Sequence, residues 1–380
     1  MVLNVGVSVM TQWFTWKNLF GRGSAADGGF NWPPPVLEEP DNTTDGQMLS
    51  PIAAPLHVRS GSALVRIDNG VLVVERAGED PFERPIELVS AVHIHGWATI
   101  TSPCIGQLIG QGTPVIWRGA TGYPIGCAMP MHQAGLEARR GQYSAVGTAQ
   151  GLGIARALVA AKIVNMRGLV RRRAALAGRN GLDTLQHFAR RAVEAPTLDI
   201  LLGIEGAATA KYFAAWPEMI SARAGDLSLD TRTRRPPLNE VNAMLSYAYA
   251  VLAGECLSAC AAAGLDPRQG FLHQPRAGRP ALALDLMEPF RPLIADQTVL
   301  AGLNRGQIDP GQFHTEGAAI LLNDDGRKLV LELLETRYLT SVTIEGRADP
   351  VTWRQAIGIS ARNLAEALKT REPFQPIERV

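Results

Sequence analysis

The spacing of the apolar residues changes once along this chain, near residue 132. Before that point apolar and polar residues alternate, as in residues 64–67 and 71–74. The Asn69-Gly70 pair between these runs is a strong signal for a hairpin turn of the primed type. Residues 55–131 are therefore predicted to form a small, mainly β domain.

After residue 132 the apolar spacing becomes helical and stays so for most of the chain. Residues 136–145, 154–176 and 240–263 repeat apolar side chains every three or four positions, which is typical of helices that bury one face. Residues 132–370 are predicted to form a larger all-α domain, and residues 371–380 an exposed, proline-rich tail. The predicted fold class is thus α+β, with a small N-terminal β domain followed by a larger helical one.

Residues 1–54 follow neither pattern. They contain Trp13, Trp16 and Trp32, a stretch of Gly, Ala, Ser and Asp, and three consecutive prolines. This composition indicates an extension or tether of unknown role. A partner-docking arm, the remnant of a fused domain and a tolerated terminal extension all remain open.

We expect the chain without residues 1–50 to fold, because the core-forming pattern begins only near Leu56. Thermal unfolding of the truncated and full chains tests this expectation. Loss of cooperative unfolding in the truncated chain would instead place the tryptophans of the extension in the core.

Composition limits the class of protein. The 380 residues are 46% hydrophobic, which is typical of a soluble globular chain of about two domains. The net charge is only +1, so any binding of nucleic acid must rely on local basic clusters. The four cysteines show no paired spacing, and no signal peptide is evident, so a cytoplasmic location is expected. Residues 241–265 are apolar enough to suggest a membrane span, but Asn242 and Glu255 favour a buried core helix, and no membrane partner is expected.

One short segment, residues 270–292, concentrates polar chemistry in apolar surroundings. It begins with His273 and continues into a helical run in which Asp285 and Glu288 stand three positions apart, on one face. Two like charges side by side favour a cation between them, and an imidazole adds a nitrogen ligand. The alternative is a solvated acidic face next to an unrelated loop histidine.

Glu205 stands alone in a second apolar run, residues 201–213. A buried carboxylate without a partner is costly, so a partner from elsewhere in the chain is expected. Glu205, His273, Asp285 and Glu288 therefore make a plausible metal site assembled from two distant segments.

At these residues the chain resembles a known family, the CRISPR-associated integrase/endonuclease of the spacer-acquisition complex. The resemblance runs from about Leu56 to the C-terminus and does not include the first fifty residues. The matching motifs occur in the family's order: Gly203-Ile204-Glu205-Gly206 with Tyr212-Phe213, Arg235-Pro236-Pro237 followed by Val241-Asn242-Ala243, Gly270-Phe271-Leu272-His273, and Asp285-Leu286-Met287-Glu288 with Phe290-Arg291-Pro292.

The resemblance implies the activity, the ligands and the partners. The helical domain would be the catalytic one, with Glu205, His273 and Glu288 as catalytic metal ligands and Asp285 as an auxiliary acid. The enzyme would insert short DNA fragments into a CRISPR repeat array by transesterification from a 3′-hydroxyl. It would act as a homodimer together with a small ferredoxin-like partner.

The residue types limit the metal and the effect of losing a ligand. Carboxylate oxygens suit Mg²⁺ or Mn²⁺, and the histidine nitrogen shifts the preference toward Mn²⁺. Zinc is less favoured, because no cysteine belongs to the cluster. Alanine at any one of the three catalytic positions is expected to abolish activity. We also expect it to leave stability without metal level or slightly higher, because it removes one of several crowded negative charges.

Basic residues also recur along residues 154–176, as Lys162, Arg167 and Arg171-Arg172-Arg173. Such a face is often only solvated surface. Beside a site that acts on phosphodiesters, binding of DNA phosphates is the better interpretation.

His93 and His95 place two imidazoles on one face of a predicted strand. This spacing suits a metal, but no acid or third histidine lies nearby in the sequence. Ordinary strand residues are the favoured interpretation.

Three other functions compete with spacer integration. A structure-specific nuclease would cleave branched DNA without the partner. A transposon-type integrase would use the same site on a different DNA target. A non-enzymatic DNA scaffold with a decayed site is disfavoured by the presence of all four candidate ligands.

Overall fold

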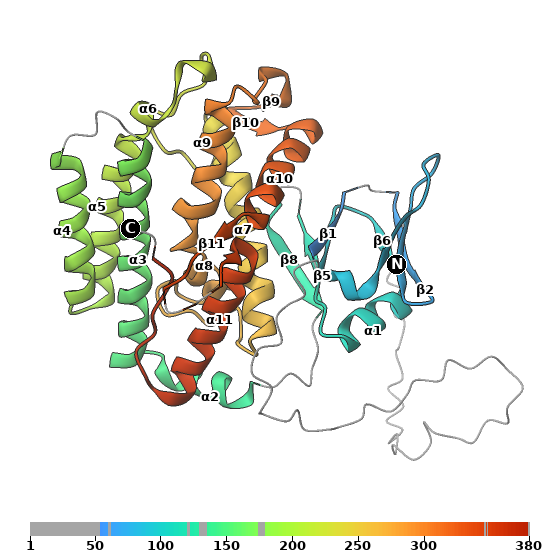
Figure 1. Cartoon of the computed structure of the whole chain (residues 1–380), viewed down its shortest axis with the longest axis horizontal. Helices are drawn as coiled ribbons and strands as arrows, with labels where there is room; N and C mark the ends of the chain where they lie inside the picture. The colour runs from blue at the N-terminus through green and yellow to red at the C-terminus, as the bar shows by residue number, and fades with distance from the viewer. Residues whose placement is uncertain are drawn as a thin grey trace, which may run out of the picture. The chain divides into compact units, whose positions relative to one another are not determined.

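The structure is a computed structural model that describes residues 54–59, 62–119, 122–128, 135–173, 179–345, 347 and 349–378 (Figure 1). The chain divides into two units, Met1–Met48 and Leu49–Val380, and all of the described residues belong to the second. The predicted extension therefore lies outside the described residues, apart from Ala54.

The first described region is rich in strands and forms two four-stranded sheets. In one, β1, β5 and β7 are parallel and β8 is antiparallel, and the other has the order β4-β3-β2-β6. At the β2–β3 hairpin, Asn69 and Gly70 have φ of 47° and 79°, the left-handed conformations that a primed turn requires. The elements are β1 (Ala54–Val58), β2 (Leu64–Asp68), β3 (Val71–Glu75), β4 (Phe82–Pro85), β5 (Val89–His95), β6 (Thr99–Ile100), α1 (Ser102–Gly110), β7 (Val115–Arg118) and β8 (Pro124–Ala128).

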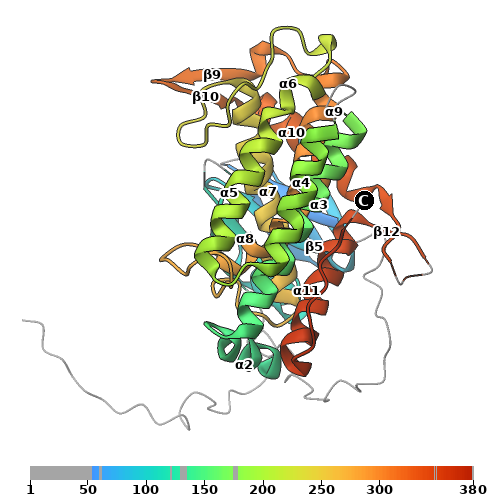
Figure 2. The ribbon, with the colours of Figure 1, turned by 90° about the vertical axis from the view of Figure 1, so that its left-hand side faces the viewer.

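The rest of the described chain is mostly helical, so the predicted α+β fold class is confirmed. Helices α3, α4 and α5 pack side by side, as both ribbon views show (Figures 1 and 2). Two small antiparallel sheets, β9–β10 and β11–β12, are added to the helices. The elements are α2 (Leu136–Ala145), α3 (Ala149–Arg173), α4 (Arg179–Glu194), α5 (Leu198–Ala214), α6 (Trp216–Met219), α7 (Glu240–Ala262), α8 (Ala281–Met287), α9 (Gln297–Asn304), β9 (Phe313–Glu316), β10 (Ala319–Leu322), α10 (Asp324–Leu339), β11 (Ser341–Val342), β12 (Val351–Thr352) and α11 (Trp353–Thr370).

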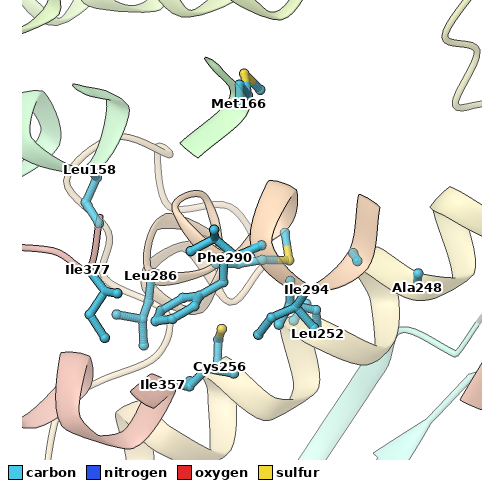
Figure 3. Close-up of a cluster of buried hydrophobic side chains, with 14 of the residues drawn as sticks. Leu158, Met166, Ala248, Leu252, Cys256, Leu286, Phe290, Ile294, Ile357 and Ile377 are labelled. Carbon is cyan, nitrogen blue, oxygen red and sulfur yellow. The ribbon is translucent and has the colours of Figure 1, made fainter. Parts of the chain in front are cut away.

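Helix α7 is the core helix of this region. Asn239 caps it, accepting a hydrogen bond of 2.8 Å from the backbone N–H of Asn242. Leu252 and Cys256 on α7 pack against Phe290 and Ile357 (Figure 3). Among the described residues, α7 is the helix with the length and composition of a membrane span, and 78% of its apolar window is buried in the protein.

The run that begins at residue 281 departs from the single helix that the sequence predicted. Helix α8 ends at Met287, and a π-helix (Arg291–Asp296) follows before α9. Pro289 has no N–H to donate to the carbonyl of Asp285, and its ring crowds that carbonyl, so a regular helix cannot continue. Glu288 therefore lies at the end of α8, where the backbone turns.

The tail after α11 is exposed at most of its described residues, as predicted, but two apolar side chains in it are buried. Phe374 and Ile377 are each 6% exposed, and the Ile377 carbonyl accepts a hydrogen bond of 3.1 Å from Asn165 Nδ2 on α3. The two apolar side chains bind the tail to the helices in spite of its prolines.

Candidate active site

Asp285, on α8, organises the loop that carries His273. Its side chain is fully buried and accepts hydrogen bonds from the backbone N–H groups of Phe271 (2.6 Å), Leu272 (2.9 Å) and His273 (2.9 Å). A Cβ at Gly270 would lie 2.7 Å from Asp285 Oδ2, so the loop approaches the carboxylate this closely only with glycine there. The loop is thus folded around the Asp285 carboxylate.

The same carboxylate fixes the histidine ring. His273 Nδ1 lies 2.7 Å from Asp285 Oδ1, and a carboxylate only accepts, so Nδ1 carries the proton. The lone pair is then on Nε2, which lies 3.9 Å from Glu288 Oε1. All four lone pairs of Asp285 are used by these bonds, which makes it a residue that orients the His273 ring.

Glu288 is buried (1% exposed) between two cations. Arg291 Nη2 lies 3.4 Å from Oε1, and Lys162 Nζ lies 2.7 Å from Oε2. Burial by itself would raise the pKa of this carboxyl, but Arg291, Lys162 and His273 outweigh it and lower the pKa to about 2. Glu288 is therefore a carboxylate at every physiological pH.

Glu205 comes from α5, two turns after the Thr197 cap, and is 18% exposed. It forms an ion pair with Lys162, which projects from α3 with its side chain 1% exposed. Three residues beyond Lys162, Asn165 Nδ2 donates a hydrogen bond of 2.9 Å to the Pro289 carbonyl. This bond holds α3 against the turn at Glu288. The Lys162 ammonium thus lies between the carboxylates of Glu205 and Glu288.

These donors fit a hard divalent cation. The centre offers two carboxylates and an imidazole nitrogen whose lone pair is already oriented, without a cysteine. Glu288 Oε2 is buried and lies 2.7 Å from the Lys162 ammonium. A buried carboxylate oxygen that faces a cation in this way is suited to a metal ion.

Residues 56–336 match the sequence profile of the CRISPR associated protein Cas1 family. The chain belongs to this family. A Cas1 protein of known structure from Thermotoga maritima superimposes with a TM-score of 0.73 at 25% identity, covering 84% of this chain and 99% of that protein.

Two curated members of the Cas1 family show how the chain compares in length. The CRISPR-associated endonuclease Cas1 1 of Thermus thermophilus is 33% identical over 84% of this chain and 98% of its own length. The CRISPR-associated exonuclease Cas4/endonuclease Cas1 fusion of Geobacter sulfurreducens is 39% identical over 85% of this chain. The match spans only 59% of that fusion.

The basic residues predicted to bind DNA lie in three different settings. Arg171, Arg172 and Arg173 are exposed at the end of α3, nine to eleven residues beyond Lys162, or about 14–17 Å along the helix. Arg167 is half-buried and donates a hydrogen bond of 3.2 Å to the Leu182 carbonyl on α4. The prediction that Lys162 belongs to an exposed basic face is wrong, because its ammonium is paired inside the site.

Arg291 is a member of the site that the sequence analysis missed. Its guanidinium also lies 4.5 Å from the centre of the Tyr249 ring. Tyr249 and Tyr212 each donate to the buried Asp296, at 2.6 and 2.7 Å. Burial raises the pKa of Asp296 to about 6, although the tyrosine hydroxyls lower it. In the sequence, Arg291 stands three residues after Glu288 in a helical run, and this spacing could have predicted their ion pair.

A second polar cluster lies between the strand-rich and helical regions of this Cas1 family chain. Among the described residues, ligand atoms of His57 (β1), His93 (β5) and Glu255 (α7) lie within 4.8 Å of one another, a spacing that could hold a metal. The sequence analysis considered His93 with His95, but not His57 or Glu255. These partners come from distant segments, so sequence spacing could not reveal them.

The arrangement of this cluster does not fit a metal ion. Arg118 Nε donates a hydrogen bond of 3.1 Å to Nδ1 of His93. The proton of the neutral ring is therefore on Nε2, the atom whose lone pair a metal would need. Arg118 also donates to the α7 carbonyls of Ala250 (3.0 Å) and Val251 (3.4 Å). The cluster therefore joins the two regions through hydrogen bonds.

Proposed function

We propose that this chain is a metal-dependent DNA endonuclease and integrase that inserts short DNA fragments into a CRISPR repeat array. The observation that carries the proposal is the setting of Glu288, which lies 3.9 Å from Nε2 of His273 and shares the Lys162 ammonium with Glu205. Membership of the Cas1 family supports the choice of DNA as substrate. The ion would be Mg²⁺ or Mn²⁺, with the histidine nitrogen favouring Mn²⁺.

The bound ion would polarise the scissile phosphodiester and stabilise the departing 3′-oxygen. The chain's own residues would prepare that step. Glu205, Glu288 and His273 would hold the ion, and Asp285 would keep the His273 ring in the required tautomer. Arg291 would keep Glu288 ionised.

The reaction balances as a transesterification. The 3′-hydroxyl oxygen of the incoming fragment forms a bond to phosphorus, the existing P–O3′ bond of the repeat breaks, and the proton lost by the attacking hydroxyl is balanced by protonation of the leaving 3′-oxygen. With water as nucleophile, the same centre hydrolyses DNA. The same centre would serve either nucleophile, so the proposal covers both integration and endonuclease activity.

A cavity of about 540 Å³ gives DNA access to the site. Glu205 lines it together with Phe213, Arg232 and Arg234. Glu205 thus faces the buried centre on one side and open space on the other. Arg234 is exposed and suits a phosphate, whereas Phe213 is buried against Trp216 and Arg232 is bound to Asn242.

The partners belong to the same proposal. The chain would act as a homodimer with a small ferredoxin-like adaptation partner, and would bind both the short duplex and the repeat DNA. The structure-specific nuclease and the transposon-type integrase use the same centre, so the DNA products must separate them.

The deciding experiment incubates the chain with a short duplex bearing 3′-hydroxyl ends, a supercoiled plasmid with a repeat, Mn²⁺, and the small partner. Sequenced junctions at the repeat boundary would support spacer integration. Junction cleavage that does not need the partner would favour the nuclease, and insertion away from the repeat would favour the transposon-type integrase.

We propose Arg171, Arg172 and Arg173 as DNA phosphate contacts. Replacing all three with alanine should weaken DNA binding equally for all sequences. It should also reduce the slope of log affinity against log salt by about three units, one per lost contact. Alanine at two exposed lysines on other helices, Lys328 and Lys369, is the control and should leave the slope unchanged. An unchanged slope in the triple variant would return this end of α3 to ordinary solvated surface.

A further inference from the structure

Lys162 is a buried lysine in a place where lysine is costly. Its side chain is 1% exposed, in the middle of a long helix whose other side chains there are mostly apolar. An ammonium removed from water must be paired. Both of its partners, Glu205 and Glu288, are carboxylates that the metal would use.

The two carboxylates that would hold the metal already have counter-charges in the metal-free centre. They face two cations, Lys162 and Arg291, while Asp285 is stabilised separately by hydrogen bonds from three backbone N–H groups and the His273 ring. A divalent cation that entered with every contact in place would meet two positive groups at close range. Its entry therefore requires one of them to give way.

The contacts of the two cations identify Lys162 as the one that gives way. Of the two carboxylates, Arg291 pairs only with Glu288, and its guanidinium also packs on the Tyr249 ring. The Lys162 ammonium contacts one oxygen of each carboxylate. Lys162 thus occupies the bridging position that an ion shared by Glu205 and Glu288 needs. A lysine side chain has four carbons of flexible stem, so its ammonium can move while α3 stays in place.

We propose that Lys162 is a built-in counter-ion that occupies the metal position in the metal-free protein and is displaced when the cation binds. This inference rests on the proposed metal site. The displaced ammonium is tethered beside the cavity at Glu205 and is available to a DNA phosphate. Metal binding and DNA binding then strengthen each other, because the metal takes the carboxylates and the phosphate takes the lysine.

The test measures Mn²⁺ binding by electron paramagnetic resonance, without DNA and without an activity readout. Lys162→Met keeps the length of the side chain and removes its charge. We expect it to bind Mn²⁺ about tenfold more tightly than the unchanged protein, a coupling of ordinary size between competing groups. Lys162→Arg keeps the charge and should stay as weak as the unchanged protein. Lys211→Met, at an exposed lysine on α5, is the matched control and should not change the affinity.

A second measurement tests the coupling with DNA. Adding a short duplex should tighten Mn²⁺ binding to the unchanged protein and should do so less in Lys162→Met. Equal or weaker Mn²⁺ affinity in Lys162→Met, in protein whose circular dichroism is native, would overturn the proposal. If Lys162→Met does not fold, then Lys162→Gln replaces it under the same criteria. Tighter Mn²⁺ binding in a protein that neither cuts nor joins DNA would refute the proposed function and leave this inference standing.

Discussion

Replacing Glu288 with glutamine will reduce both strand transfer and DNA cleavage by a factor of about 10³ or more. The substitution keeps the shape of the side chain but removes the charge that would hold a metal, and loss of a single preorganised electrostatic group already costs about 10²–10³ in rate. Glu205→Gln and His273→Asn should act in the same direction. DNA binding should survive, because the proposed phosphate contacts at Arg171–Arg173 lie about 14–17 Å along α3 from Lys162.

The measurement is the rate of junction formation in Mn²⁺, alongside DNA affinity in EDTA. Glu366→Gln, in an exposed ion pair with Lys369 on α11, is the control and should retain full activity. Near-normal rates in Glu288→Gln or His273→Asn would refute the metal site.

The structure reverses the expected effect of these changes on stability. The sequence analysis treated the acids as crowded like charges, but Glu288 pairs with Lys162 and Arg291. Glu288→Ala should therefore destabilise the metal-free protein, by about 3 kcal/mol, because it strands buried cations. Urea unfolding in EDTA will show this loss.

The protein should lose stability steeply as the pH falls below about 6. The pKa values of His57 and His93 are lowered well below the usual value, first by burial and then by Arg118, and that of His95 is lowered to about 3 by the same causes. All three are neutral when folded but take up a proton when unfolded below about pH 6.5. The unfolded state then binds more protons, so stability is complete above that pH and is lost on acidification.

Each histidine contributes a slope of up to about 1.4 kcal/mol per pH unit, or about 4 for the three together. Asp296, whose pKa is raised to about 6, holds its proton in the folded state and opposes this slope below that pH by about 1.4 kcal/mol per pH unit. Glu335 and Glu255 lie 3.7 Å from His57 Nε2 and His93 Nε2 and favour the charged rings, but both are already paired with Arg354. The experiment compares urea unfolding at pH 7.5, 6.5 and 5.5.

His95→Gln should lower the slope below pH 6 by about 1.4 kcal/mol per pH unit. His187→Gln, at an exposed histidine on α4, should leave it unchanged. A flat profile from pH 7.5 to 5.5 would show that the rings do not stay neutral in the folded protein.

The sequence by itself determined the fold class and pointed to the candidate metal ligands. The change of period near residue 132 reflects side-chain directions that differ between strands and helices, and this is a local property. Glu205, His273 and Glu288 could be found because each is polar in an apolar run, and burial of such groups always requires a partner.

Only the tertiary structure decided what each polar residue contacts. Whether Lys162 pairs with carboxylates or faces solvent depends on how α3, α5 and the Glu288 turn pack together, and the helical period of α3 is the same in both cases. Asp285 became an orienting residue because the loop before α8 folds back onto it. The histidine cluster joins β1, β5 and α7, segments that are distant in sequence. Such contacts arise from packing between elements, which the pattern within any one element does not encode.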